Sequence, residues 1–165
     1  MKTMQAVTFL TLGLLLVVSV ACAQETQDKV APAGPVWFTS LEKATVEAQK
    51  AGKPILMDFT GSDWCGWCIK LRKEVFDTQE FKDWAVKNVI LLEVDFPQRK
   101  AQDDATKKQN QKLQSEYKVE GYPTIVFVTA AGKELGRSGY MRGGPKVWTD
   151  AADKIIAPKK PETAK

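Results

Sequence analysis

The chain has 165 residues, three cysteines, no histidine and a formal net charge of +4. A chain of this length holds one domain with a single hydrophobic core. The charge is mild and comes without a basic tract interleaved with aromatic residues, so binding to nucleic acid is not expected.

The N-terminal residues 1–23 have the pattern of a secretory signal peptide. They begin with a short basic start at Lys2, continue as an apolar run to Ala21 and end in "ACA". A basic start, an apolar stretch and small residues at its end predict cleavage after Ala23. The run is short for a membrane span of about 20 residues, so we expect export to the periplasm or beyond, without stable membrane insertion. Lipid attachment at Cys22 stays open as the alternative.

The mature chain keeps two cysteines once the signal peptide has left. Both lie in one motif, "CGWC", so a framework of structural disulfides is excluded by counting. Polar, proline-containing sequence at 24–35 and 158–165 predicts a flexible leader and a flexible tail. Between them, residues 36–157 form the expected folded domain, which we expect to be a monomer.

Apolar periodicity, together with capping and turn residues, predicts a domain in which helices alternate with strands. The first helix has Ser40 as a plausible N-cap and Gly52 as its stop, and a later helix can be capped by Thr78. In chain order, the predicted elements are a helix at 41–51, a strand at 54–60, a helix from about 66 to 77, a further helix after 78, a strand in "NVILLEVDFP", a strand at 124–129, a turn at "AAGK", a strand in "KELGRSGY" and a helix in "GPKVWTDAADKII".

The connections between the strands predict an α/β fold. The first two strands flank a helical crossover, which favours a parallel pair. The last two are joined by a tight turn around Gly132 and must be antiparallel. The result is a mixed central sheet with helices on both faces. On the helix that follows the cysteine motif, Ile69, Val75 and Phe76 are expected to share one side.

The segment 98–112, "QRKAQDDATKKQNQK", contains no large apolar residue. This composition predicts either a solvated helix or a mobile loop. Its excess of cations would suit a docking surface, but charged runs usually face water, so a surface insertion is the expectation.

The motif "MDFTGSDWCGWCIKL" at 57–71 poses a choice between metal binding and dithiol redox chemistry. Structural zinc sites usually take four Cys or His ligands, and the mature chain offers two cysteines and no histidine. We therefore expect no metal and no other cofactor. Two thiolates could still hold a soft ion such as Cu(I), so a copper-handling protein stays open.

Dithiol chemistry fits the position of the two cysteines better. A helix that begins at the motif would place Cys65 at its N-terminus, where unpaired N–H groups and the helix dipole favour a thiolate. Cys68 would lie one turn further in and be the more buried sulfur. Cys65 is therefore the candidate nucleophile and Cys68 the candidate resolving thiol, with a Cys65–Cys68 disulfide as the oxidised form.

The motif "WCGWC" after "DF" at a strand end, and "GYPT" before another strand, resemble the active-site motif and the cis-proline loop of the thioredoxin family. The similarity covers most of the mature chain and is strongest to exported bacterial thioredoxin-like proteins of the thiol-disulfide interchange type. It implies a thioredoxin-like fold, with a mixed sheet of four to five strands flanked by helices on both faces. It also implies exchange with cysteine-containing proteins and with a redox partner protein.

The resemblance carries over to further site residues. Asp58 matches a buried acid beneath the resolving cysteine, where a raised pKa would let it accept a proton near neutral pH. The alternative is an aspartate at a strand end that hydrogen-bonds to backbone. Pro123 matches the cis-proline, and Tyr122 the residue whose backbone pairs with a substrate strand. The residues implied to bind substrate are Trp64, Gly66, Trp67, Tyr122, Pro123 and Gly139.

Three features depart from the family pattern. The lysine that often accompanies the buried acid is replaced by a leucine, Leu91. The residues between the cysteines are Gly-Trp, so no histidine there stabilises a thiolate. Asp63 would oppose ionisation of Cys65, while Lys70 and Arg72 would offset it. Together these features indicate a pair that is not extremely oxidising, which favours the reductase or isomerase direction.

We therefore expect an exported thiol-disulfide oxidoreductase that acts on cysteines of partner proteins. The alternative of another class is a non-catalytic module that binds protein through the groove around Trp64, Trp67 and Tyr122. A thiol pair that never cycles in a physiological redox buffer would favour this alternative.

Overall fold

The computed structural model describes residues 34–157. The predicted signal peptide, Cys22, most of the predicted leader and the predicted tail lie outside these residues, so those expectations stay predictions. The described elements are β1 (Trp37–Phe38), α1 (Leu41–Ala51), β2 (Ile55–Thr60), α2 (Gly66–Leu71), the π-helical segment η1 (Arg72–Phe76), α3 (Gln79–Asn88), β3 (Ile90–Asp95), α4 (Asp104–Glu116), β4 (Thr124–Val128), β5 (Glu134–Ser138) and α5 (Gly144–Ile156).

The five strands form one mixed sheet in the order β1-β3-β2-β4-β5. β2 pairs in parallel with β3 and antiparallel with β4, and β4 pairs antiparallel with β5. The predicted strand directions and the mixed sheet are therefore confirmed. β1 extends the sheet along β3 as a parallel edge strand. The sequence does not predict it, because two residues are too few to show an alternating pattern.

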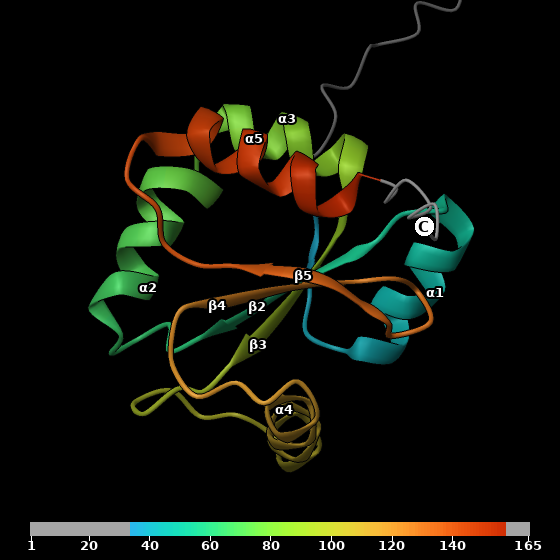
Figure 1. Ribbon diagram of the computed structural model, residues 1–165. Helices are drawn as coiled ribbons and strands as arrows, with labels where there is room; N and C mark the ends of the chain where they lie inside the picture. The colour runs from blue at the N-terminus through green and yellow to red at the C-terminus, as the bar shows by residue number, and fades with distance from the viewer. Residues whose placement is uncertain (1–33, 158–165) are drawn as a thin grey trace, which may run out of the picture. The chain divides into compact units, whose positions relative to one another are not determined.

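Helices cover both faces of the sheet (Figure 1). α2, α3 and α5 cover one face, and α1 and α4 cover the other. Because successive side chains of a strand point to opposite faces, β2 contributes to two cores. Leu56 packs in the core beneath α3 and α5, whereas Met57 and Phe59 pack in the core against α1 and α4.

The predicted helix ends are marked by the expected side chains. The Ser40 hydroxyl accepts the N–H of Lys43 at 3.4 Å at the start of α1. The Thr78 hydroxyl accepts the N–H of Phe81 at 3.3 Å at the start of α3. Gly52 ends α1 with a φ of +63°, in the left-handed region that glycine enters without steric cost. These capping predictions are confirmed.

The helix after the cysteine motif departs from regular geometry, because α2 is continued by η1. Leu71 and Phe76 are buried, but Ile69 is 49% exposed. The expectation that Ile69 shares the buried side is therefore wrong. A π-helical turn takes one residue more than an α-helical turn. In a regular α-helix, two turns are about seven residues, so Ile69 would lie on the same side as Phe76. The extra residue in the π-helical turn shifts this position by one, and the residue that is buried there is Cys68.

The polar segment 98–112 contains an ordered helix. α4 begins after its N-cap Asp103 and runs on to Glu116, so the helix alternative is right from residue 104 onward. The side of α4 that faces the sheet carries a buried amide, Asn110, whose Nδ2 donates to the Asp95 carbonyl oxygen at 2.8 Å. No helix within residues 34–157, α4 included, has the length and apolar character needed to cross a bilayer.

Candidate active site

The two cysteines lie at the junction between β2 and α2. Cys65 is the N-cap of α2. It forms a disulfide with Cys68, and their Cα atoms are 5.3 Å apart. The Cys68 backbone N–H donates to Cys65 Sγ at 3.3 Å. The first turn of the helix therefore presents a hydrogen-bond donor to the sulfur of Cys65.

Both cysteines are buried in this oxidised form, with 7% of Cys65 and 4% of Cys68 exposed. Cys65 is the more accessible of the two, but by a small margin, because the disulfide turns its sulfur toward Cys68. The exposed surface of the motif belongs to the tryptophans, Trp64 at 38% and Trp67 at 53%. Between them, a Cβ built on Gly66 would meet no heavy atom within 4 Å, so the space above the first turn of α2 is open.

The loop before the dithiol is fixed to the chain that leaves β3. Trp64 Nε1 donates to the Phe96 carbonyl oxygen at 2.8 Å. The Ser62 hydroxyl donates to the Asp95 carboxylate at 2.6 Å, and the Ser62 backbone N–H donates to the same carboxylate at 2.9 Å. These hydrogen bonds thus link the loop that follows β2 to the end of β3, immediately before Cys65 in the sequence.

Asp63 is an anchor for the polar segment. Its carboxylate accepts the backbone N–H groups of residues 98–100 at 2.7 to 3.0 Å. These hydrogen bonds, that of Gln98 above all, hold the pKa of Asp63 below its usual range. The Asp63 carboxylate, whose charge was expected to oppose ionisation of Cys65, is therefore hydrogen-bonded to the backbone of this segment. Lys70 and Arg72, the cations expected to offset that charge, have other partners.

The "GYPT" sequence lies beside the loop that carries Trp64. The Tyr122–Pro123 peptide bond is cis. The Tyr122 ring meets Trp64 edge to face, with ring centroids 5.9 Å apart, and its hydroxyl accepts a hydrogen bond from Gln114 at 2.8 Å. Gly139, which follows β5, lies next to the same loop, since a Cβ there would stand 3.4 Å from the Pro123 carbonyl oxygen. The structure thus brings these four site residues together.

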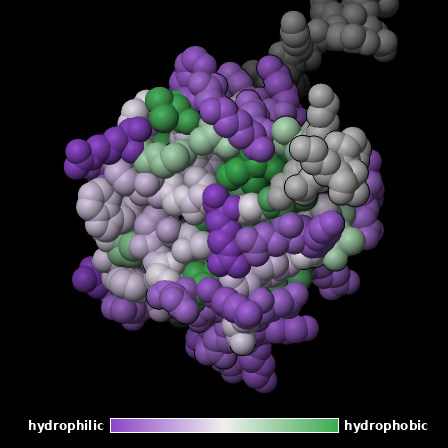
Figure 2. Space-filling model, in the orientation of Figure 1, coloured by the Kyte–Doolittle hydropathy of each residue, from purple (hydrophilic) through white to green (hydrophobic). Residues whose placement is uncertain are grey.

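Trp67 packs on a tyrosine that the sequence analysis missed. The Trp67 and Tyr140 ring centroids are 5.1 Å apart, and Lys70 Nζ lies 5.3 Å from the centroid of each ring. The Tyr140 hydroxyl donates to Glu74 at 2.7 Å. Its position directly after Gly139 is the signal that could have found it. In Figure 2 the side of the molecule at α2 is mostly pale, of intermediate hydropathy, and both hydrophobic and hydrophilic residues border it.

Asp58 lies within β2 and is 3% exposed. By the alternation of the strand, its carboxyl points to the same side as Leu56, the side that α2 covers. Among the residues that the structure describes, its Oδ1 is the one buried side-chain oxygen or nitrogen without a hydrogen-bond partner. Burial raises the pKa of Asp58 from 3.8 to about 7. Its Oδ1 therefore lacks the backbone hydrogen bond that the alternative of a strand-end aspartate would give it.

Three charged side chains act on this carboxyl. In the parallel pairing of β2 with β3, Asp58 is opposite Glu93, and Glu93 forms an ion pair with Arg72 of η1. Arg72 opposes the rise in the pKa of Asp58, while Glu93 and then Asp95 add to it. Leu91, which replaces the expected lysine, lies in the apolar core. The cation near Asp58 is therefore supplied by the helix and not by the strand.

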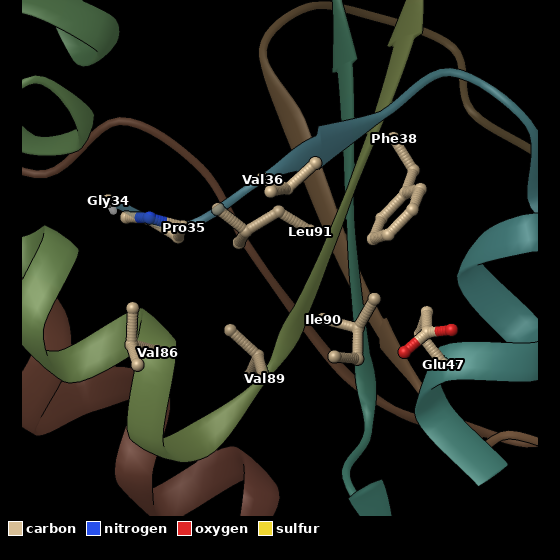
Figure 3. Close-up of a pocket in the computed structure, with 9 residues that line it drawn as sticks. All are labelled: Gly34, Pro35, Val36, Phe38, Glu47, Val86, Val89, Ile90 and Leu91. Carbon is tan, nitrogen blue, oxygen red and sulfur yellow. The ribbon is translucent and has the colours of Figure 1, made fainter. Parts of the chain in front are cut away.

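An apolar cavity of about 250 Å³ lies beside β1 and the start of β3 (Figure 3). Val36 and Phe38 at β1, and Ile90 and Leu91 at the start of β3, contribute to its wall. Cys65, by contrast, follows the end of the parallel strand β2, so the length of the strands separates cavity and dithiol. Neither this cavity nor any other place within residues 34–157 groups three or more side chains that could hold a metal ion.

Known proteins resemble this chain in sequence and in structure. The family model of the thioredoxin-like domain matches residues 41–152. The disulfide bond reductase DsbH of Chlamydia pneumoniae is 40% identical over 118 residues, which cover 72% of this chain and 71% of DsbH. A solved structure of a DsbH oxidoreductase matches with a TM-score of 0.72 at 36% identity, over 81% of this chain and 92% of that one.

Other relatives are longer proteins, of which this chain spans a minor part. The thioredoxin-related protein DsbJ of Chlamydia pneumoniae is 28% identical over 84% of this chain, but over only 38% of its own length. In structure alone, a thioredoxin from Thermus thermophilus, which is not one of these longer proteins, shares the fold with a TM-score of 0.57 at 19% identity, over 76% of this chain and 89% of that chain. The predicted family and fold are thus confirmed. The chain belongs to the thioredoxin-like family, and with its Cys65–Cys68 pair it is a thiol-disulfide oxidoreductase.

Proposed function

We propose that the chain is an exported reductase of protein disulfides, with Cys65 as nucleophile, Cys68 as resolving thiol and Asp58 as proton acceptor. The observation that carries the proposal is the Cys68 N–H that donates to Cys65 Sγ in the first turn of α2. A thiolate at Cys65 would accept the same hydrogen bond and lie at the positive end of the helix dipole, and both effects favour the anion. The similarity to DsbH, a disulfide bond reductase, supports the reductase direction.

The exchange takes place in two displacements. The Cys65 thiolate attacks one sulfur of the substrate disulfide, that S–S bond breaks, and the other substrate sulfur leaves as a thiolate. Cys68 then gives its proton to the Asp58 carboxylate and attacks Cys65 Sγ in the mixed disulfide, which releases the second substrate thiolate. Two electrons have passed to the substrate, and the chain is left as the Cys65–Cys68 disulfide. A dithiol partner protein must reduce this disulfide before the next cycle.

The surface around the dithiol suits an extended segment of a cysteine-containing protein. Gly66 leaves open space above the first turn of α2, so a substrate backbone can approach Cys65 there. Tyr122 and Pro123 lie beside Trp64 and offer backbone groups to a neighbouring strand, while Gly139 keeps the far side of this loop free of a side chain. The exposed ring of Trp67 adds apolar surface for a substrate side chain.

Export is supported by the sequence pattern of residues 1–23. Fusion of this segment to a reporter that folds only outside the cytosol tests it directly, with Lys2 and the apolar run deleted as the control. Mass spectrometry of the mature N-terminus then distinguishes cleavage after Ala23 from a lipid-modified Cys22.

The roles of the two sulfurs are tested by trapping. Cys65→Ser and Cys68→Ser should both abolish insulin reduction, but only Cys68→Ser should accumulate a mixed disulfide with its substrate, because it keeps the nucleophile and lacks the resolving thiol. Full activity in Cys65→Ser would contradict the mechanism.

The role of Asp58 as proton acceptor is tested by the rate at which the mixed disulfide is resolved. Asp58→Asn should form the mixed disulfide normally and resolve it up to about a hundredfold more slowly near neutral pH. Asp83→Asn, at an exposed position on α3, is the matched control.

A further inference from the structure

An ion pair lies between the dithiol helix and β3, at the position that faces Asp58. Arg72 is the first residue of η1, and its guanidinium is paired with the Glu93 carboxylate. Glu93 is the residue directly opposite Asp58 in the pairing of β2 with β3. Arg72 lowers the pKa of Asp58 and Glu93 raises it, so the two members of the pair act on the same carboxyl in opposite directions.

The Arg72 side chain is held from more than one side. Besides the pair with Glu93, its guanidinium carbon lies 5.0 Å from the centroid of the Trp37 ring on β1. The Arg72 and Glu93 side chains are 32% and 24% exposed. A partly buried, fixed charge is screened less by salt and water than a mobile charge at the surface. Arg72 therefore acts on its neighbours from a defined position.

A cavity of about 270 Å³ connects this position with the resolving cysteine. Cys68 and Thr60 are the buried residues of its wall, and Lys73 and Asp77 are exposed ones. Arg72 belongs to the same wall. Arg72 and the resolving cysteine therefore border the same cavity.

We propose that Arg72, held by Glu93, is a positioning residue that sets the pH range in which Asp58 can take the proton of Cys68. The inference rests on the role proposed above for Asp58. The charged groups that act on Asp58 are Arg72 on η1 and Glu93 and Asp95 on β3. In the reduced form the Cys68 thiol on α2 is a further titratable group beside Arg72, in the wall of the same cavity. On β4 the residue opposite Asp58 is the apolar Ile125.

The physical reason is the number of negative charges around Asp58. Two carboxylates and burial all favour its protonated form, and Arg72 alone favours the carboxylate. With a pKa of about 7, roughly half of Asp58 is ionised at neutral pH and ready to accept a proton. Without the guanidinium, Asp58 would stay protonated to higher pH, and Cys68 would have no acceptor where the dithiol works.

The test uses two substitutions that break the same ion pair but remove charges of opposite sign. Carboxyl-carbon NMR follows the titration of Asp58 in the oxidised protein, with Asp58→Asn to assign the signal. Arg72→Gln should move the titration midpoint of Asp58 to higher pH, and Glu93→Gln should move it to lower pH. The midpoint of the double variant should lie between those of the two single variants. Arg72→Lys keeps the charge and should move it less than Arg72→Gln. Arg137→Gln breaks the Arg137–Glu134 pair on β5 and should leave it unchanged.

The kinetic counterpart is the rate at which the mixed disulfide is resolved. In Arg72→Gln this rate should fall at pH 7 and recover at higher pH, because a rise of one unit in the midpoint cuts the ionised share about fivefold. If the pair has a structural role alone, both single variants shift the NMR midpoint in the same direction or not at all, and the role of Arg72 is refuted. If Asp58→Asn resolves the mixed disulfide at the normal rate, the role of Asp58 itself fails, whatever the midpoints do.

Discussion

Trp64 is hydrogen-bonded to Phe96, directly after β3: its indole N–H donates to the Phe96 carbonyl oxygen at 2.8 Å. The same ring meets Tyr122 of the cis-proline loop edge to face. One side chain thus contacts both loops that border the dithiol. Its orientation is fixed by a hydrogen bond on one side and by an aromatic contact on the other.

Gly61 leaves the space that this tryptophan occupies. A Cβ at Gly61 would lie 2.5 Å from the Trp64 ring, far inside van der Waals contact. We expect Gly61→Ala to displace Trp64 and to lower kcat/KM for insulin reduction about tenfold to a hundredfold, because small misplacements at a reacting site are costly. Gly34→Ala, where the nearest atom is 3.9 Å away, is the control. Wild-type kinetics in Gly61→Ala would show that the position of Trp64 does not matter.

Asp63 is expected to hold residues 98–100 in place. Asp63→Ala removes the acceptor of three backbone N–H groups, so the amides of these residues should exchange with solvent about tenfold faster or more. Hydrogen exchange read residue by residue measures this, with Asp83→Ala on α3 as the matched loss of an exposed carboxylate. Because the pKa of Asp63 is held below its usual range, the protection in the wild type should persist through neutral pH and fade only in acid. Unchanged exchange at 98–100 would exclude the anchoring role.

Tyr140 is expected to support substrate binding through Trp67. Tyr140→Ala removes the ring that packs on Trp67 and should raise KM about threefold to tenfold with a smaller effect on kcat, the range expected for one aromatic contact. Tyr140→Phe keeps the ring, loses only the hydroxyl that donates to Glu74, and should behave nearly as the wild type. If Tyr140→Ala changes kcat and leaves KM alone, the ring acts on the chemistry and not on binding.

The parts of the fold that the sequence predicts correctly depend on local signals. Ser40 and Thr78 cap helices in the structure because a hydroxyl before a helix satisfies a free N–H wherever the helix packs. The dithiol could be assigned to redox chemistry because the chain lacks the ligands for zinc. Neither conclusion requires knowledge of which elements are neighbours in space.

The parts that the sequence does not predict depend on tertiary partners. The helix α4 could not be distinguished from a loop, because its buried side carries Asn110, a polar residue whose Nδ2 finds its acceptor outside the helix, in the Asp95 carbonyl oxygen. The ion pair of Arg72 with Glu93 depends on the register of β2 with β3 and on the π-helical turn. Alternation along β3 places Glu93 on the same side as Leu91, but nothing local identifies its partner.

Asp58 destabilises the folded protein when it is ionised. Its pKa rises from 3.8 to about 7 on folding, mainly through burial, so the folded chain holds this proton more tightly than the unfolded chain. Between about pH 4 and pH 7 the folded state keeps a proton that the unfolded state has lost, and the free energy of unfolding falls as pH rises. The total effect of this one carboxyl is about 4 kcal/mol.

Asp58→Asn removes this dependence, because an amide of the same shape does not ionise. We expect the oxidised variant to be more stable than the wild type above pH 7, by up to about 4 kcal/mol, and the difference to shrink steadily toward pH 4. Urea unfolding at a series of pH values measures both free energies, and Asp83→Asn at its exposed site should show no such trend. A difference between Asp58→Asn and wild type that stays constant with pH would mean that the carboxyl is ionised throughout, as in water. The same Asp58→Asn protein should be the slower enzyme, because the carboxyl that lowers the stability of the folded chain near neutral pH is also the proposed acceptor of the Cys68 proton.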